Sequence, residues 1–404
     1  MAVEPPSLPQ ARALAPAAPR LVLIRGGRGP RQGTADGRPV IAHVVATRPD
    51  AIKLAPVHAA LAERGVFHQV VVHTGQHTDP ALTTEIFDDL ELSAPAHVLA
   101  TGAGTHGAQT ARALAVAETL LAELRPAAIV VAGAANSTLG VALAASKLGV
   151  PVARVEAGLR EHDWSVGEEV NRTLLDTMAD TLFAPTAQAA GDLHAEGAGA
   201  DRVHHVGSTA VDSLRRAERG AAARATWLRF GAERGRYVLV TLHRPANVDD
   251  DERLARIVEG LAELARRVPV IFPLHPRTRE RLKPMGDAHR LLAAGVLCGP
   301  PLGYLDFVSL QWGAGAVVTD SGTVQEEAST LGVPCYTLRS STERPITITH
   351  GTNSLLADPR DLAEVRPAAG PPTPCAIPLW DGRAAQRVAD ALVANYALVR
   401  AAGC

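Results

Sequence analysis

Short apolar runs alternate with segments of helical spacing along the chain from Val40 onward. The runs VIAHVVAT, HQVVVHTG and AAIVVAG are rich in β-branched residues and continuously apolar, which is typical of buried parallel strands. Residues 51–65 and 105–124 lie between these runs and have the apolar spacing of helices. Because parallel strands need a crossover connection, this alternation predicts right-handed βαβ units.

The same alternation divides the strands into two sets. PVARVEAG, TLFAPT and RVHHVG complete a first parallel sheet, and a second set begins near Arg236 with YVLVTL, VPVIFPLH, GVLCG, GAVVTDSG, VPCYTLR and SLLA. Further helices are predicted over 137–149, 168–180, 250–267 and 324–331. The predicted fold class is α/β, with two Rossmann-like doubly wound domains that face each other across a cleft.

Four segments are expected along the chain. They are a flexible N-terminal extension (1–39), an N-terminal Rossmann-like domain (40–206), a C-terminal Rossmann-like domain (207–382) and a C-terminal helix that packs back (383–404). The extension alternates Ala, Pro and Arg around one strand-like run, Leu21–Ile24, and has no apolar segment typical of a secretory signal. The helical stretch 207–235 is expected to bridge the two domains.

Composition excludes some classes of partner. The chain has 404 residues, 47% of them hydrophobic and 20% charged, with a net charge of −2. No basic excess points to nucleic acid, and no apolar run reaches the ~18–20 residues that a membrane span needs. The four cysteines never form a C-x-x-C pair, which argues against a zinc site or a disulfide framework and favours a reduced cytoplasm.

The segment ATRPDAIKLAP, residues 46–56, follows the first strand and opens a helix. Backbone N–H groups and the helix dipole favour anions at such a place, and Arg48 and Lys53 add positive charge. The plainer alternative is an ordinary helix start with a surface arginine.

Carboxylates gather in VEAGLREHDWSVGEEVNR, residues 155–172. Glu156 stands at a strand end, where an apolar setting would raise its pKa into the range of general acid–base catalysis. Glu168 and Glu169 open the next helix, and acids in a first turn often serve only the helix dipole.

Two histidines follow strands of the second set. His243, beside Arg244, follows YVLVTL, and His275 follows VPVIFPLH. Each histidine alone could be a hydrogen-bonded turn residue, but together they favour an anion site at one sheet edge.

The segment VVTDSGTVQEEASTLGVP, residues 317–334, is the most informative one. Ser321 and Gly322 lie in a strand-to-helix turn whose free N–H groups suit a diphosphate, and Glu326 or Glu327 is placed to accept hydrogen bonds from ribose hydroxyls. The loop RSSTERP adds Arg344 on the same side. With no G-x-G-x-x-G after the first strand and no Walker sequence, NAD and ATP are disfavoured as ligands.

One turn lacks the expected chemistry. In IVVAGAANSTLG, residues 129–140, a strand ends at Gly133-Ala134-Ala135, which has the place of a catalytic loop but no acid, base or nucleophile.

Taken together, these segments resemble the non-hydrolysing UDP-N-acetylglucosamine 2-epimerases, which have a GT-B-type fold. The matching motifs run in family order over about residues 41–355: TRPDAIKLAPV, TGQH, VEAGLR, EEVNR, LFAPT, TLHRPANVD, DSGTVQEE, LGVP and TERPITITHGTN. The N-terminal extension and the final segment carry none of them.

The resemblance implies a UDP-sugar substrate bound in the cleft, anti elimination of UDP through a glycal-like intermediate, and re-addition with a proton delivered to the opposite face of C2. It implies no metal or other cofactor, and a homodimer. The implied catalytic residues are Glu156, Glu168 and His243. The substrate-binding residues that the resemblance implies are Arg48, His243, Ser321, Gly322 and Glu327. The charged and polar loops described above add Lys53, His275 and Arg344 to the predicted substrate-binding residues. In bacterial members a second UDP-GlcNAc binds near TGQH as an activator, which here points to Gln76 and His77.

The sequence also departs from the family pattern. Family members usually carry a catalytic Asp where this chain has Ala134, and a His where it has Arg154. The nucleotide half is therefore expected to be preserved and the sugar half altered. His162 and Asp163 are nearby acids or bases that could substitute.

Several functions follow from this pattern. The first is a 2-epimerase of UDP-GlcNAc or a close UDP-hexosamine. The alternatives are a UDP-sugar hydrolase or eliminase, an enzyme of specialised metabolism with an altered substrate, a retaining GT-B glycosyltransferase and a non-catalytic nucleotide-sugar sensor.

Overall fold

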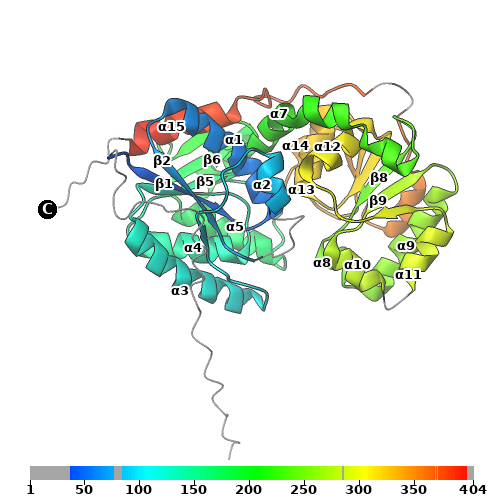
Figure 1. Ribbon diagram of the computed structural model, residues 1–404, viewed down its shortest axis with the longest axis horizontal. Coiled ribbons are helices and arrows are strands. Elements are labelled where there is room, and N and C mark those ends of the chain that lie inside the picture. The colour runs from blue at the N-terminus through cyan, green and yellow to red at the C-terminus, as the bar shows by residue number, and fades with distance from the viewer. Residues whose placement is uncertain (1–36, 77–83, 284–285, 369, 371, 398–404) are drawn as a thin grey trace, which may run out of the picture.

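The computed structural model describes residues 37–76, 84–283, 286–368, 370 and 372–397. Within this part of the chain, the strands form two parallel sheets that lie side by side (Figure 1). The first has seven strands in the order β3-β2-β1-β4-β5-β6-β7, and the second has six in the order β10-β9-β8-β11-β12-β13. The two parallel sheets confirm the predicted α/β fold class.

The first sheet is covered by helices on both faces. Its strands are β1 (Val40–Val45), β2 (His68–His73), β3 (His97–Val98), β4 (Ala128–Val131), β5 (Val152–Val155), β6 (Thr181–Ala184) and β7 (Val203–His205). Its helices are α1 (Arg48–Arg64), α2 (Thr84–Asp89), α3 (His106–Leu124), α4 (Asn136–Lys147), α5 (Gly167–Met178) and α6 (Ala187–Ala195). Successive strand residues belong to different apolar clusters: Val130 packs with α1 and Val131 with α3 and α4. This two-sided burial explains why the strands read as continuous apolar runs.

The second sheet repeats this plan. Its strands are β8 (Val238–Thr241), β9 (Val270–Pro273), β10 (Leu297–Gly299), β11 (Ala316–Thr319), β12 (Cys335–Thr337) and β13 (Asn353–Leu355). Its helices are α8 (Pro245–Val248), α9 (Asp251–Ala265), α10 (Pro276–Leu282), α11 (Asp287–Ala293), α12 (Tyr304–Gly313), α13 (Gly322–Leu331) and α14 (Ile346–Thr349), with a 3₁₀ turn at Pro359–Glu364.

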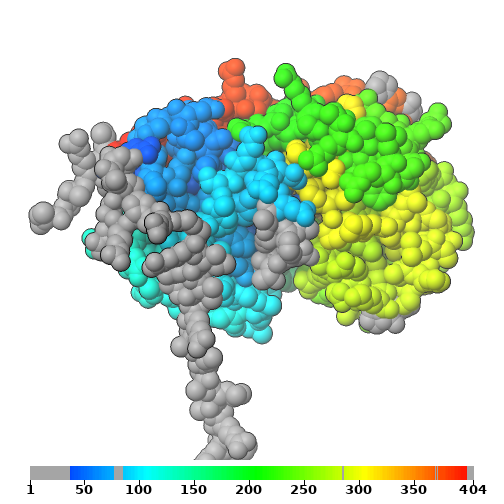
Figure 2. Space-filling model, viewed as in Figure 1, coloured from blue at the N-terminus to red at the C-terminus, as the bar shows by residue number. Residues whose placement is uncertain are grey.

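Two helices tie the halves together. Helix α7 (Thr209–Arg224), followed by a 3₁₀ turn at Thr226–Phe230, contacts α1 on one side and α12 and α13 on the other, and its residues lie along the upper edge where the halves meet (Figure 2). Helix α15 (Ala384–Tyr396) follows the second sheet in sequence but packs on α1. The Tyr396 hydroxyl lies 2.7 Å from that of Thr181 in β6. The domain boundaries themselves stay a prediction.

Strand order decides where a ligand can enter. In each sheet the order reverses beside the first strand of the set, so a crevice opens past the carboxyl ends of β1 and β4, and past those of β8 and β11. The segments after these four strands contain Arg48, Ala134, His243 and Ser321. The two crevices therefore bring the predicted site segments to one region.

Some expectations fall outside these observations. The strand-like run Leu21–Ile24 and most of the extension lie outside the described residues. Strand β3 and helix α2 were not predicted, because a strand of two residues and a helix of six residues leave too short a periodic pattern.

Candidate active site

An open cleft between the two domains collects the predicted site residues. Its walls come from the carboxyl ends of β1, β4 and β5 in one domain and of β8, β9 and β11 in the other. His77 lies outside the described residues. Twelve other predicted residues line this cleft: Arg48, Lys53, Gln76, Ala134, Glu156, Glu168, His243, His275, Ser321, Gly322, Glu327 and Arg344. His162, predicted as a possible substitute for the missing acid, is not among the lining residues.

Asp320, which the sequence reasoning did not single out, positions the loop after β8. Its buried carboxylate lies 3.0 Å from Nδ1 of His243 and accepts hydrogen bonds from the backbone N–H groups of His243 and Arg244 and from Nδ2 of Asn247. Burial alone would raise the pKa of Asp320, but His243 and the N–H donors outweigh it and hold that pKa below its usual range. This negative charge orients the His243 ring in the cleft.

His275 has the plainer of its two predicted roles and also lies in the cleft wall. It is the N-cap of α10, where Nδ1 accepts the backbone N–H of Arg277 at 3.2 Å. Its ring also stands 5.3 Å from that of His243, and both histidines line the cleft. A structural cap and a cleft position therefore coexist in one residue.

Gly322 opens α13 directly beside a buried arginine. A Cβ added at this position would overlap with Nη1 of Arg344 and Oε1 of Glu343, so a larger residue would displace the ends of these two side chains. The same turn presents the N-terminus of α13 to the cleft, next to a fixed guanidinium. This combination of free N–H groups and positive charge suits a diphosphate.

Glu327 lies one turn further along α13 and is buried. Its oxygens accept hydrogen bonds from the hydroxyl of Tyr304 at 3.1 Å and from Nε2 of Gln311 at 2.7 Å. Burial raises the pKa of Glu327 to about 7. Tyr304 and Gln311 are on α12, and no local pattern announced them as partners of this carboxylate.

Arg48 lies at a further helix N-terminus of the cleft, that of α1. Its Nη1 donates to the carbonyl oxygen of Leu302 at 2.7 Å, and its guanidinium lies 5.6 Å from the ring centre of Phe307. Both partners belong to the second domain, so Arg48 spans the cleft. The helix start is therefore more than a turn with a surface arginine.

Glu156 corrects one expectation. It follows β5 with a φ of 63° and is buried, yet its setting is ionic. Oε2 lies 2.5 Å from Nζ of Lys53, and Oε1 lies 3.1 Å from Nη2 of Arg344. Burial would raise the pKa of Glu156, but these two cations outweigh it and lower the pKa. The prediction of an apolar setting and a raised pKa was wrong, because both partners come from segments distant in sequence.

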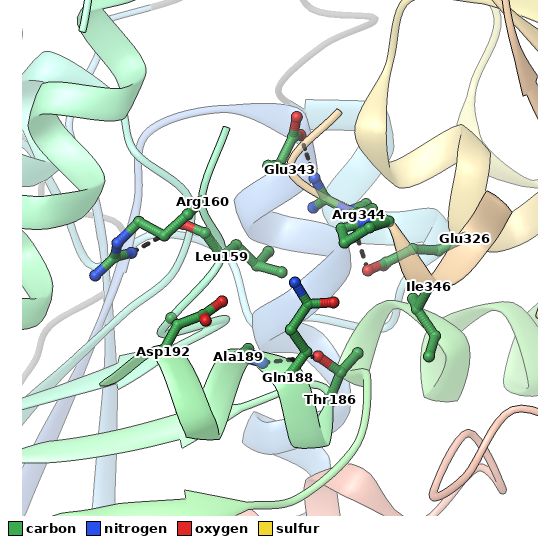
Figure 3. Close-up of a pocket in the computed structure, with 12 residues that line it drawn as sticks. Leu159, Arg160, Thr186, Gln188, Ala189, Asp192, Glu326, Glu343, Arg344 and Ile346 are labelled. Carbon is green, nitrogen blue, oxygen red and sulfur yellow. Dashed lines mark hydrogen bonds and ion pairs between the residues drawn. The ribbon is translucent and has the colours of Figure 1, made fainter. Parts of the chain in front are cut away.

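Arg344 is the centre of a larger ionic network (Figure 3). Besides Glu156 it binds Glu326, at 3.0 Å, and Glu343. A second interdomain link joins Glu161 of the first domain to Arg339 of the second at 2.7 Å. These buried ion pairs hold the two walls of the cleft together at its inner end.

The turn after β4 has a different character. Nδ2 of Asn171 donates to the carbonyl oxygen of Ala134 at 2.9 Å and to Oδ1 of Asn136 at 3.0 Å. Nδ2 of Asn136 in turn lies 2.8 Å from Oε1 of Gln109 and 3.0 Å from Nδ1 of His106. Amide groups rather than charges therefore hold this corner of the cleft.

The two glutamates that open α5 have separate roles. Glu169 is buried, lies 2.7 Å from Nη2 of Arg172 and accepts the backbone N–H groups of Glu161 and His162. Glu168 is exposed in the cleft wall, and the described residues offer it no hydrogen bond or ion pair. Only Glu168 is thus available to a ligand.

Other kinds of site find no support in the described residues. They contain no group of three or more His, Cys, Asp or Glu side chains that could hold a metal ion. None of the helices in the described ranges is long and apolar enough to cross a membrane. Cys298, Cys335 and Cys375 are free thiols.

Comparisons with known proteins agree with this geometry. The family profile described as UDP-N-acetylglucosamine 2-epimerase matches residues 59–393. A UDP-N-acetylglucosamine 2-epimerase of Methanocaldococcus jannaschii is 41% identical over 326 residues, which are 79% of this chain and 88% of the relative. A UDP-2,3-diacetamido-2,3-dideoxy-D-glucuronate 2-epimerase of Pseudomonas aeruginosa is 40% identical over 322 residues, with the same coverage of 79% and 88%.

Solved structures show the same relationship. The crystal structure of the M. jannaschii UDP-GlcNAc 2-epimerase in complex with UDP-GlcNAc and UDP superposes with a TM-score of 0.82 at 37% identity, covering 88% of this chain and 99% of that one. The Neisseria meningitidis enzyme bound to UDP-GlcNAc superposes with a TM-score of 0.76 at 25% identity, covering 88% of this chain and 100% of that one. The GT-B-like arrangement of the two sheets is shared with these structures.

Proposed function

Since the chain belongs to the UDP-N-acetylglucosamine 2-epimerase family, we propose that it is an isomerase that interconverts UDP-GlcNAc, or a close UDP-hexosamine, with its 2-epimer. The observation that carries the proposal is the polarity of the cleft. One end has a helix N-terminus, His243 and Arg344, which suit a leaving diphosphate, and the other has carboxylates that can move a proton.

The chemistry follows from these two ends. A base removes the C2 proton while the C1–O bond breaks, and the electron pair of that bond leaves with UDP. The glycal-like intermediate then takes UDP back at C1 as an acid delivers a proton to the other face of C2. Cations at the diphosphate end stabilise the negative charge that grows on the leaving group.

Each predicted residue takes a role in this scheme. Arg48, Ser321 and Gly322 bind the nucleotide and diphosphate, with His243 held toward them by Asp320. Glu327 accepts hydrogen bonds from the ribose hydroxyls. Glu156 fixes Lys53 and Arg344 at the reacting end, and Glu168 handles a proton.

The sugar is the less constrained part of the proposal. The M. jannaschii and P. aeruginosa relatives, at 41% and 40% identity, are named for different UDP-sugars. The departure from the family pattern at Ala134 remains a prediction, as do an activator near Gln76, a homodimer and a cytoplasmic location.

An NMR assay in D₂O tests the proposal. The protein is incubated separately with UDP-GlcNAc and with UDP-2,3-diacetamido-2,3-dideoxy-D-glucuronate. Deuterium at C2 together with the 2-epimer is the expected result. Free UDP with a glycal or a free sugar indicates elimination or hydrolysis, and no turnover of either sugar contradicts the proposed function.

A further inference from the structure

Six carboxylate side chains among the described residues line the cleft, and their different surroundings decide which of them can transfer a proton. They are Asp50, Glu156, Asp163, Glu168, Glu327 and Glu343. A group that moves the C2 proton must be able to change its protonation state and must reach the sugar. Four of the six fail one of these requirements.

Two of the four are fixed as anions. Glu156 lies between Lys53 and Arg344, and Glu343 lies 2.7 Å from Nη2 of Arg339 and also binds Arg344. These cations hold the pKa of both carboxyls below the ordinary value, against the opposing effect of burial. A carboxylate in such a setting is a poor proton donor.

The other two are occupied elsewhere. Glu327 is bound by Tyr304 and Gln311 of α12, which places it at the nucleotide end. Asp163 accepts the backbone N–H of Ser165 at 2.9 Å and its hydroxyl at 2.6 Å, in an exposed loop. Glu168 and Asp50 remain.

Asp50 is at the third position of α1 and 1% exposed. Its Oδ2 accepts the backbone N–H groups of Ala46 at 3.1 Å and Thr47 at 2.9 Å, so one oxygen completes the helix start. Its other oxygen, Oδ1, lies where a Cβ at Gly133 would be, directly against the turn that continues into Ala134.

The two remaining carboxylates flank one turn. Asp50 touches it at Gly133, and α5, which carries Glu168, touches it through the bond from Asn171 to the carbonyl oxygen of Ala134. A sugar lying over this turn would have one carboxyl group toward α1 and the other toward α5.

We propose that Asp50 is a catalytic proton-transfer residue of the epimerisation, serving one face of the sugar C2 atom while Glu168 serves the other. The inference rests on the proposed function. In one direction the Asp50 carboxylate takes the C2 proton as the C1–O bond breaks, and Glu168 as a carboxylic acid protonates the opposite face as UDP re-adds. The two groups then exchange protons with water, which resets the site for the next turnover.

The state of Asp50 agrees with this role. Burial raises its pKa to about 6, against the lowering effects of Lys53 and of the two backbone N–H groups. A group with a pKa near the working pH is both a competent base and a competent acid. The geometry agrees as well, because Oδ1 lies against the turn at Gly133 in the cleft wall, away from the two backbone N–H groups that Oδ2 accepts.

The test compares Asp50→Asn with wild type in D₂O. Asn keeps an oxygen that can accept the N–H groups of Ala46 and Thr47 but cannot carry the proton. We expect kcat for epimerisation and the rate of deuterium entry at C2 to fall ~10²–10⁴-fold, with KM changed less than about threefold. The matched control is Asp192→Asn, a change of the same kind on α6 outside the cleft, which keeps wild-type rates.

Further variants separate catalysis from folding. Adding Ala134→Asp to Asp50→Asn places a carboxylate on the same turn, and we expect at least a tenfold recovery of kcat. Asp50→Glu keeps the charge and is used if the Asn variant unfolds; the displaced carboxylate should lower kcat at least tenfold.

The outcomes are distinct. A kcat within threefold of wild type for folded Asp50→Asn, or for Asp50→Glu where the Asn variant unfolds, overturns the role of Asp50 alone. Wild-type protein that turns over neither UDP-sugar overturns the proposed function, and this inference with it.

Discussion

Glu156→Gln removes one charge from the buried contact between the two domains. In the native protein this carboxylate lies between Lys53 and Arg344, and the three side chains are only 4–5% exposed. Breaking a buried ion pair by removing one partner costs about 3–5 kcal/mol of unfolding free energy, because the remaining charge stays desolvated. Arg344 keeps Glu326 and Glu343 as partners, so Lys53 suffers most. We therefore expect a loss of about 3 kcal/mol.

The loss of unfolding free energy in Glu156→Gln should depend on pH in a definite direction. Lys53 and Arg344 lower the pKa of Glu156 below its ordinary value of 4.5. A carboxyl with a lowered folded pKa stabilises the native state above the unfolded pKa, and this contribution is lost as the pH falls through the folded pKa. The difference in unfolding free energy between wild type and Glu156→Gln should therefore be full at pH 7 and shrink below about pH 4.5.

Urea unfolding followed by circular dichroism at pH 7 and pH 4 measures both quantities. The matched control is Glu196→Gln, which removes a carboxylate that lies 2.6 Å from Arg160 but is 42% exposed. Because the Glu196 carboxylate is solvated and the buried Arg160 keeps Asp176 as a partner at 2.7 Å, this change should cost less stability than Glu156→Gln. A loss in Glu156→Gln no larger than in the control, or one that does not change with pH, would refute the reasoning.

Two further predictions concern the nucleotide end. In Gly322→Ala the new Cβ overlaps with Arg344 and Glu343, so UDP should bind at least tenfold more weakly, as measured by isothermal titration calorimetry. The control is Gly220→Ala, which adds a Cβ in open space on α7 and should leave UDP binding unchanged. Equal affinities of the two variants for UDP would contradict this reasoning. Burial raises the pKa of Glu327 to about 7, so ionising this carboxyl destabilises the native state as the pH rises from about 4.5 to 7. In thermal melts, Glu327→Gln should therefore become more stable relative to wild type over that pH range. A difference in melting temperature that stays constant with pH would argue against this prediction.

Much of the fold could be predicted because the apolar runs in the sequence coincide with strands that are buried in the two sheets. Strands such as β4 and β11 are buried on both faces, so they appear in the sequence as apolar runs. The turns that follow them contain small residues, Gly133 after β4 and Gly322 after β11. A doubly wound sheet binds ligands at these turns, so the strand ends pointed to cleft residues such as Glu156, His243 and Ser321.

The electrostatics of the site could not be predicted in the same way. Glu156 and Arg344 are 188 positions apart and meet only because the domains close on each other. His243 owes its orientation to Asp320, 77 positions later. The sign of a pKa shift depends on such partners, which explains why the strand-end position of Glu156 led to the wrong direction.

The contrast between the two ends of the cleft bears on which sugars the protein accepts. Around Arg344 the cleft is cross-linked by buried ion pairs, which fix the guanidinium in one position. Around Ala134 the turn is held by amide hydrogen bonds of Asn136 and Asn171, whose groups can satisfy either a donor or an acceptor, and the carboxylates of Asp50 and Glu168 flank it. Under the proposed function, the substituents on the sugar would meet the adaptable end and the leaving group the fixed one. Differences in substrate among relatives should arise at the turn after β4 rather than at the nucleotide end.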